Sequence, residues 1–390
     1  MSVNEPNVVE QVANNEATEK SLDELAAERT ESCEDDIPLA DVKDRYHFVK
    51  HIFCFLGLVS VLPFNVFITP TDYWMYKFRD VNNSQAMGIH PNKTKLQTYF
   101  FSYMTVASNM PVLFMIFVNV LWGHKYVKCV IGTASRFPPD YMHSLITGQA
   151  FSGLFPTFIQ ILSLIGHVDP LKSALFYFTG TNITIILVFI GFLISQRTTF
   201  FKYHESKEST SEEIIDKDTP LMMHIWPYAL CGLVSCWVTL SVFPICVLIL
   251  PRHPNLTLWS GRFFIPLAFF LVYNSSDFCG RILGGILSIS HRHLLLTLSI
   301  LRWLIAVLII FCNIHPRNHL PVAFKNEACF IFFILLLGFS NGYVFTNAMV
   351  AAPKKVAMEY REKVGFILAL FASIGVNLGS FTSSLLLEII

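Results

Sequence analysis

Nine long apolar runs limit the folds that this chain can adopt. An α-helix needs about 20 predominantly apolar residues to cross the hydrocarbon core of a bilayer, and each run is close to that length. Of the 390 residues, 53% are hydrophobic and only 14% are charged, whereas soluble proteins have roughly 25% charged residues. We therefore predict an all-α polytopic membrane protein whose transmembrane helices cover residues 48–70, 98–122, 141–165, 171–195, 224–250, 263–288, 294–314, 328–350 and 364–390.

The sixth run carries polar and charged side chains on one face. Asn274, Asp277 and Arg281 are spaced at i, i+3 and i+7, so they share one side of a helix. A charge in the bilayer interior costs about 2.5–3.5 kcal/mol on insertion scales, and pairing of Asp277 with Arg281 would offset part of this cost. The two residues form either a structural ion pair or part of a polar face along a solute path. Asn274, deeper in the run, favours the second interpretation.

Asn65 is a polar residue within the first apolar run. It follows Pro63, which lacks a backbone donor and can bend the helix. An amide in hydrocarbon needs a hydrogen-bond partner. Two interpretations stay open: Asn65 bonds to a neighbouring helix, or it faces a solute.

Two hydrophilic segments divide the chain. Residues 1–43 are acidic and contain no aromatic residue, which is typical of a disordered tail. Residues 196–223 mix Lys, Glu, Ser, Thr and Asp, and they separate four apolar runs from five. We predict a cytoplasmic tail at 1–43, an N-terminal helix group at 44–195, a cytoplasmic linker at 196–223 and a C-terminal helix group at 224–390.

Basic residues and glycosylation sequons indicate the orientation in the membrane. With Lys20 and Arg29 of the distal tail left out, Lys and Arg number 15 on the side predicted to be cytoplasmic and 9 on the side predicted to be outside, which is the bias of the positive-inside rule. The loop after the first run holds sequons at Asn82 and Asn92. We predict a cytoplasmic N-terminus, a luminal or extracellular C-terminus, and glycosylation at these two residues.

The sequence lacks the motifs of several other classes of protein. It contains no Gly-rich phosphate loop, HExxH, GxSxG or paired Cys ligands, so we predict no enzymatic activity, no cofactor and no metal site. The formal net charge of zero leaves no basic footprint for nucleic acid. Intramembrane Asn, Gln, Asp and Arg instead indicate a path for a polar, uncharged solute, because together they offer donors and acceptors. Nearby aromatic rings could stack on a planar part of that solute.

Four motifs resemble those of the equilibrative nucleoside transporters. LPFNVFIT at 62–69 is similar to the family's first-helix signature, and YNSSDFCGR at 273–281 is similar to its eighth-helix signature. SNGY at 340–343 and PKKV at 353–356 match the tenth helix and the turn that follows it. The stretch DYWMYKFRD at 72–80 is most similar to the lysosomal-type member. The resemblance extends from about residue 44 to the last residue.

The resemblance implies a major-facilitator-like bundle in two helix groups, but the family has eleven helices and this chain has about nine. The segment GTASRFPPDYMHSLITGQ at 132–149 resembles the junction between the family's fourth and fifth helices. We therefore expect the third helix and most of the fourth to be absent. The family's fourth helix supplies a Gln that contacts the nucleobase, and this residue has no counterpart here.

The resemblance also assigns residues to a binding site. It implies that the substrate is contacted or flanked by Phe64, Asn65, Ile68, Val106, Phe243, Phe270, Asn274, Asp277 and Arg281. Asp277 and Arg281 would bind the ribose hydroxyls, since a carboxylate beside an arginine is a sound acceptor for two adjacent hydroxyls. Close helix packing is expected at Gly148, Gly153, Gly280 and Gly342, and Gly148 is also expected to flank the cavity.

Two hypotheses for function follow from the resemblance. The first is facilitative transport, by alternating access, of nucleosides such as adenosine and uridine, with nucleobases as a further class. The second is a shortened, non-transporting form that associates with a full-length homologue and regulates or titrates it. The resemblance suggests endolysosomal membranes, and the plasma membrane is the alternative location.

Overall fold

The computed structural model describes residues 43–78, 94–121, 130–166, 170–206, 221–250, 263–289, 291–315, 317 and 319–390. The sequons at Asn82 and Asn92, nearly all of the tail predicted at 1–43, and most of the linker predicted at 196–223 lie outside these ranges. Contacts divide the chain into residues 1–45 and 46–390, and the second unit contains all the long helices. The division of that unit into two helix groups remains a prediction.

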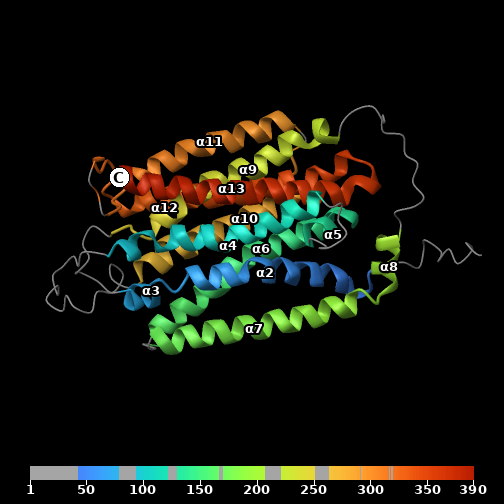
Figure 1. Ribbon diagram of the computed structural model, residues 1–390, viewed down its shortest axis with the longest axis horizontal. Helices are drawn as coiled ribbons and strands as arrows, with labels where there is room; N and C mark the ends of the chain where they lie inside the picture. The colour runs from blue at the N-terminus through green and yellow to red at the C-terminus, as the bar shows by residue number, and fades with distance from the viewer. Residues whose placement is uncertain are drawn as a thin grey trace, which may run out of the picture. The chain divides into compact units, whose positions relative to one another are not determined.

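Helices account for most of the described chain, with only isolated bridges in place of strands in these ranges. The prediction of an all-α polytopic membrane protein is therefore confirmed. The long helices are α2 (Phe48–Ile68), α4 (Lys95–Leu121), α6 (Pro139–Ile165), α7 (Pro170–Ser195), α9 (Leu221–Cys246), α10 (Val272–Ile286), α11 (Arg292–Ile310), α12 (Glu327–Ala351) and α13 (Arg361–Ile389) (Figure 1). The shorter ones are α3 (Thr71–Lys77), α5 (Val130–Arg136), α8 (Thr199–Ser206), η3 (Ile265–Leu271), η4 (Pro353–Lys355) and η5 (Met358–Tyr360).

Eight helices in the described ranges are long and apolar enough to cross a membrane. The ninth predicted span, 263–288, is also helical, but it is divided into a π-helical segment, η3, and the α-helix α10. Pro266 lies at the start of η3. Proline cannot donate the usual i to i−4 hydrogen bond, and this favours a change of helical register at that point.

Helix α2 packs against α6 and α7, and its contact with α6 is especially close. A Cβ atom added at Gly57 would meet the carbonyl oxygen of Leu145, and one added at Gly148 would meet the carbonyl oxygen of Cys54. Glycine at both positions lets the two backbones approach each other. The predicted packing glycine Gly148 therefore lies between two helices, with its missing side chain directed at α2.

The later helices pack in a similar way. Helix α10 lies along α12, α9 lies along α13, and α11 packs against both α9 and α12. A Cβ atom at Gly280 would meet the carbonyl oxygen of Phe339, and one at Gly342 would meet the carbonyl oxygen of Asp277. These two glycines bring the backbones of α10 and α12 together at the level of the charged pair on α10.

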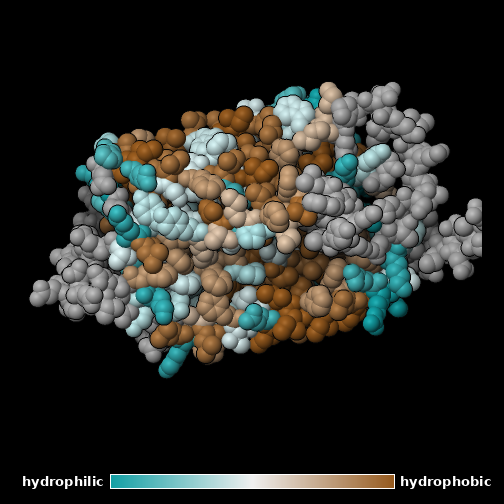
Figure 2. All heavy atoms as spheres, viewed as in Figure 1, coloured by the Kyte–Doolittle hydropathy of each residue, from teal (hydrophilic) through white to brown (hydrophobic). Residues whose placement is uncertain are grey.

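Several contacts join the early helices to the later ones, including that of α5 with α13. Helix α6 packs against η3 and α10, and α4 packs chiefly against α13 (Figure 1). Large apolar side chains on α4 remain exposed, among them Tyr103, Phe114 and Met115. Helix α7 is similar: Phe176 and Leu187 on it are 71% and 64% exposed. Apolar residues also cover much of the face shown in Figure 2, as expected of helices that face lipid.

Candidate binding cavity

A cavity of about 450 Å³ is lined by residues of the early helices α2, α4, α5 and α6 and of the later helices α9, α10, α12 and α13. This volume is within the range of about 300–1,000 Å³ that is typical of small-molecule sites. Its polar lining comes from Ser60, Asn65, Asn109, Gln149, Thr239, Asn274, Asp277, Arg281, Asn341 and Ser373. Its aromatic lining comes from Phe64, Phe243, Tyr273 and Phe345. The cavity thus combines apolar rings with a small number of hydrogen-bonding groups.

The charged pair predicted on the sixth run forms one wall of the cavity. The Nε atom of Arg281 donates to Oδ2 of Asp277 at 2.8 Å; the side chain of Asp277 is buried, and that of Arg281 is 11% exposed. Arg281 also reaches α6, where its Nη1 atom donates to the carbonyl oxygen of Ile146 at 2.9 Å and to Oε1 of Gln149 at 3.4 Å. Its guanidinium lies over the ring of Phe345, 5.3 Å from the centroid. The pair therefore stabilises the α6–α10 contact while facing the cavity.

The second oxygen of Asp277 is bonded to α12. The Nδ2 atom of Asn341 donates to Oδ1 of Asp277 at 2.7 Å. Asn341 in turn accepts, at its Oδ1 atom, from Thr239 and from Arg302, both at 3.1 Å. Each carboxylate oxygen of Asp277 therefore has one protein donor, and further acceptor positions on each remain for a solute.

Arg302 on α11 was not among the predicted site residues. It is only 2% exposed and lies behind Asn341, outside the cavity lining. It also donates to Oγ of Ser340 at 3.1 Å, to the carbonyl oxygen of Ser235 at 3.0 Å and to Oγ1 of Thr239 at 2.7 Å. An arginine inside an apolar run is itself a signal for a functional position, and the run at 294–314 contains this one.

Two asparagines connect the cavity wall to α6. Nδ2 of Asn65 donates to Oγ of Ser152 at 2.7 Å, and Nδ2 of Asn274 donates to the carbonyl oxygen of Gly153 at 3.1 Å. Both asparagines also line the cavity. The two interpretations of Asn65, a bond to a neighbouring helix and a position facing a solute, are therefore compatible in the structure. The side chain of Asn274 lies directly against Gly153, where a Cβ atom would meet it.

The other predicted substrate residues are placed differently. Phe64 and Phe243 line the cavity, and the ring of Phe243 lies 5.1 Å from that of Tyr273. Ile68 and Phe270 are each 1% exposed and belong to an apolar core cluster outside the lining.

Val106 on α4 is also outside the lining, and α4 contributes Asn109, Val112 and Ile116 from later turns instead. Gln149 lines the cavity although only its neighbour, Gly148, was predicted there. Since Gly148 is directed at α2, the next residue along the helix is turned toward the cavity. A glutamine within an apolar run was the sequence signal for this position.

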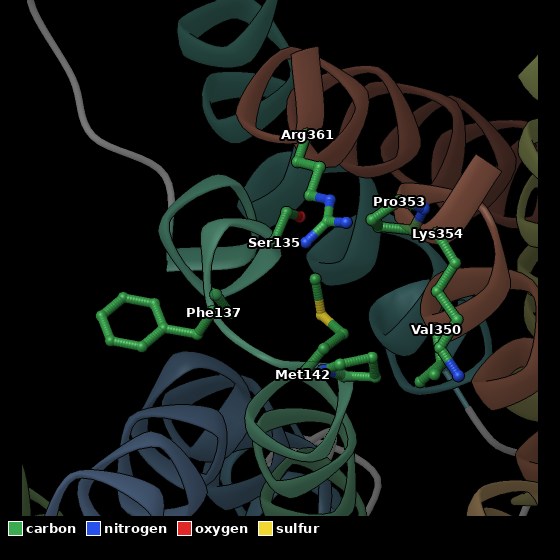
Figure 3. Close-up of a pocket in the computed structure, with 9 residues that line it drawn as sticks. Ser135, Phe137, Met142, Val350, Pro353, Lys354 and Arg361 are labelled. Carbon is green, nitrogen blue, oxygen red and sulfur yellow. The ribbon is translucent and has the colours of Figure 1, made fainter. Parts of the chain in front are cut away.

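A second, much smaller pocket lies where α5 and α6 meet α12 and α13. Its volume of about 10 Å³ has room for no more than about one water molecule. In Figure 3, Arg361 points toward the space between Ser135 and Met142, with Lys354 across from them. Near this pocket, Arg136 on α5 and Glu362 on α13 form an ion pair. This region joins the early and late helices and is too small to hold an organic solute.

Comparison with known proteins agrees with this architecture. The family model described as nucleoside transporter matches residues 112–224 and 219–388, and the chain belongs to that family. Equilibrative nucleoside transporter 3 of Rattus norvegicus is 26% identical to it over 426 aligned positions, which cover 88% of this chain and 90% of the relative. Equilibrative nucleoside transporters 2 and 1 of Homo sapiens are each 24% identical, covering 88% and 89% of this chain and 97% and 98% of the relatives.

These alignments also bear on the length of the chain. The three alignments run over 426, 445 and 452 positions, which is more than the 390 residues of this chain. The relatives therefore contain segments that have no counterpart here. All three are named as transporters rather than as enzymes.

Proposed function

We propose that this chain carries nucleosides across a membrane by facilitated diffusion, with alternating access to the central cavity. The observation that carries the proposal is the position of Asp277. Its carboxylate is held by Arg281 and Asn341 at the wall of a cavity of about 450 Å³ that is lined from both early and late helices. Membership of the nucleoside transporter family supports the same substrate class.

The chemistry of the cavity suits a nucleoside. An ionised carboxylate accepts hydrogen bonds only, so Asp277 is matched to the two adjacent hydroxyls of a ribose. The rings of Phe64, Phe243 and Tyr273 offer apolar surface to a planar base. Gln149, whose amide both donates and accepts, is the cavity residue that we assign to polar recognition of the base.

The substrates that we expect are ribonucleosides such as adenosine and uridine. Nucleobases should be poorer substrates, because they lack the hydroxyls that Asp277 would bind. Adenosine, uridine and their free bases should therefore compete for uptake with very different affinities. Inhibition of uridine uptake by free uracil as strong as that by uridine would contradict this sugar-centred mode of binding.

Alternating access requires that contacts between the early and late helices break and re-form. The ion pair of Arg136 with Glu362 and the small pocket beside Arg361 form such a contact. The predicted orientation places this contact on the cytoplasmic side. We propose that it holds that end of the cavity shut and that it opens when the solute is released to the cytoplasm.

The exposed surface of α4 favours a second function, which is regulation of a full-length homologue. This helix packs chiefly against α13 and exposes Tyr103, Phe114 and Met115, together with the polar residue Ser108. The relatives contain additional segments, and we expect the family's third helix and most of its fourth to be absent from this chain. A form with this exposed surface could associate with a full-length homologue and regulate it without transporting.

Uptake of radiolabelled adenosine and uridine tests the first function against the second. The chain is expressed in cells without nucleoside transporters, at neutral and acidic pH, with surface protein and endolysosomal co-localisation measured in parallel. Saturable uptake above that of vector-transfected cells supports transport. No uptake from well-expressed protein, together with altered uptake by a co-expressed full-length homologue, supports the regulatory form instead.

A further inference from the structure

Arg302 has contacts that set the direction of a chain of hydrogen bonds toward the cavity. Helix α11 packs beside α9 and α12 (Figure 1), and Arg302 on it is 2% exposed. Its Nη2 atom lies 2.7 Å from Oγ1 of Thr239 on α9 and 3.1 Å from Oδ1 of Asn341 on α12. A guanidinium can donate hydrogen bonds but cannot accept them. Both of these partners must therefore present an acceptor to Arg302.

The orientation of the Asn341 amide follows from this restriction. The two ends of an asparagine amide have nearly the same shape, so surrounding donors and acceptors decide which end points where. Arg302 requires the oxygen of Asn341, and Thr239, which accepts from Arg302, donates its hydroxyl hydrogen to the same oxygen at 3.1 Å. The amide nitrogen is consequently directed at Asp277, to whose Oδ1 atom it donates at 2.7 Å.

This orientation determines what Asp277 presents to the cavity. Asn341 donates a hydrogen bond to Oδ1 and Arg281 donates one to Oδ2, so each carboxylate oxygen has one protein donor. A carboxylate has about four acceptor positions, so about two remain for hydroxyl groups of a solute. A reversed Asn341 amide would instead place two oxygen atoms against each other, and the carboxylate would turn or lose this support.

We propose that Arg302 is a positioning residue for sugar recognition: by acting only as a donor it fixes the Asn341 amide, and through it the Asp277 carboxylate that binds the vicinal hydroxyls of a nucleoside. This role rests on the proposed function. Arg302 is not among the residues that line the cavity. Its effect is on discrimination between ribonucleosides and their dideoxy analogues rather than on binding of the base.

Two replacements by shorter polar side chains test the donor-only requirement. In Arg302→Lys the new side chain still only donates. In Arg302→Gln it donates and accepts, so it no longer dictates which end of Asn341 faces Asp277. Arg292→Gln is the matched control, because Arg292 lies at the exposed start of the same helix.

The experiment measures binding to the purified full chain. Thermal stabilisation by uridine and by 2′,3′-dideoxyuridine gives an affinity ratio for each variant. We expect wild type, Arg302→Lys and Arg292→Gln to prefer uridine strongly. The ratio should fall about tenfold in Arg302→Gln, since a charge-assisted hydrogen bond to a hydroxyl is worth about that factor. Asn341→Leu should lower the ratio equally, and the double variant should lower it no further.

Two results would overturn the role of Arg302. In one, Arg302→Gln and Asn341→Leu keep the wild-type ratio. In the other, Lys and Gln weaken uridine and dideoxyuridine binding by the same factor, which indicates packing alone. If Arg302→Gln does not fold, the role is overturned by a ratio in Arg302→Lys as low as that in Asn341→Leu, or by a wild-type ratio in Asn341→Leu. A folded wild-type chain that no nucleoside stabilises would overturn the proposed function itself, and this role with it.

Discussion

Gly342 on α12 lies directly against the backbone carbonyl oxygen of Asp277 on α10. The two helices touch at this point without an intervening side chain. The contact also places Asn341, the residue before Gly342, within 2.7 Å of the Asp277 carboxylate. Gly342 lets the two helices approach each other closely, and its neighbour in sequence, Asn341, can therefore reach the carboxylate of Asp277.

Gly342→Ala should destabilise the protein and impair the site. A Cβ atom at this position meets backbone rather than a movable side chain, and such overpacking costs typically about 1–3 kcal/mol. Gly180→Ala is the matched control, since nothing lies within 4 Å of its added Cβ. Purified Gly342→Ala should unfold at a clearly lower temperature than purified Gly180→Ala. Equal unfolding temperatures would show that α10 and α12 do not depend on this close approach.

The ion pair between Arg136 and Glu362 should couple transport to closure of one end of the cavity. Reversing one charge, as in Arg136→Glu or Glu362→Arg, places like charges together and should lower uptake severalfold. The double reversal restores an attractive pair and should recover most of the uptake. Initial rates of uridine uptake, normalised to surface protein, provide the measurement. If the free-energy losses calculated from the uptake rates of the two single variants add up in the double variant, Arg136 and Glu362 do not act as a pair.

Arg317 should be needed for stability of the connection between α11 and α12. Its guanidinium donates to the carbonyl oxygens of Ile310 and Cys312 at 2.7 Å and to those of Leu320 and Pro321 at 3.0 and 2.6 Å. A lysine ammonium is a single point of charge and cannot reproduce this fork. Arg317→Lys should therefore cost on the order of 3 kcal/mol, as several hydrogen bonds to a charged group are lost.

Thermal unfolding measures this loss, with Arg292→Lys as the control, because Arg292 is exposed and its Nε atom donates to the exposed ring of His293 at 3.4 Å. If the unfolding temperature of Arg317→Lys falls no further than that of the control, the connection between α11 and α12 does not depend on the guanidinium.

The sequence predicts more of the fold than of the site. Apolar run length predicts the helices well, because hydrocarbon admits few other structures. It does not predict the π-helical turn of η3, since hydropathy carries no information on the hydrogen-bond register. The spacing of Asn274, Asp277 and Arg281 correctly predicts that they share a face, which follows from helix geometry alone.

Contacts between distant helices explain what the sequence does not predict. Ile68 and Phe270 resemble binding residues in sequence, yet the packing of neighbouring helices encloses both in the core. Gln149 and Arg302 contribute to the site only because α6, α11 and α12 bring them to Asp277 and its partners. Which side of a helix faces the cavity depends on these neighbours, and a single sequence does not specify them.

The most direct measurement of the central claim is uridine uptake by Asp277→Asn. The substitution keeps the size of the side chain but removes the charge and replaces one acceptor oxygen with a donor, so binding of the ribose hydroxyls should weaken. We expect uptake efficiency to fall by about tenfold or more, while 2′,3′-dideoxyuridine uptake changes little. Asp140→Asn, at an exposed position near the start of α6, should retain wild-type uptake. Wild-type uridine uptake by a well-expressed Asp277→Asn chain would contradict the assignment of this cavity as the nucleoside site.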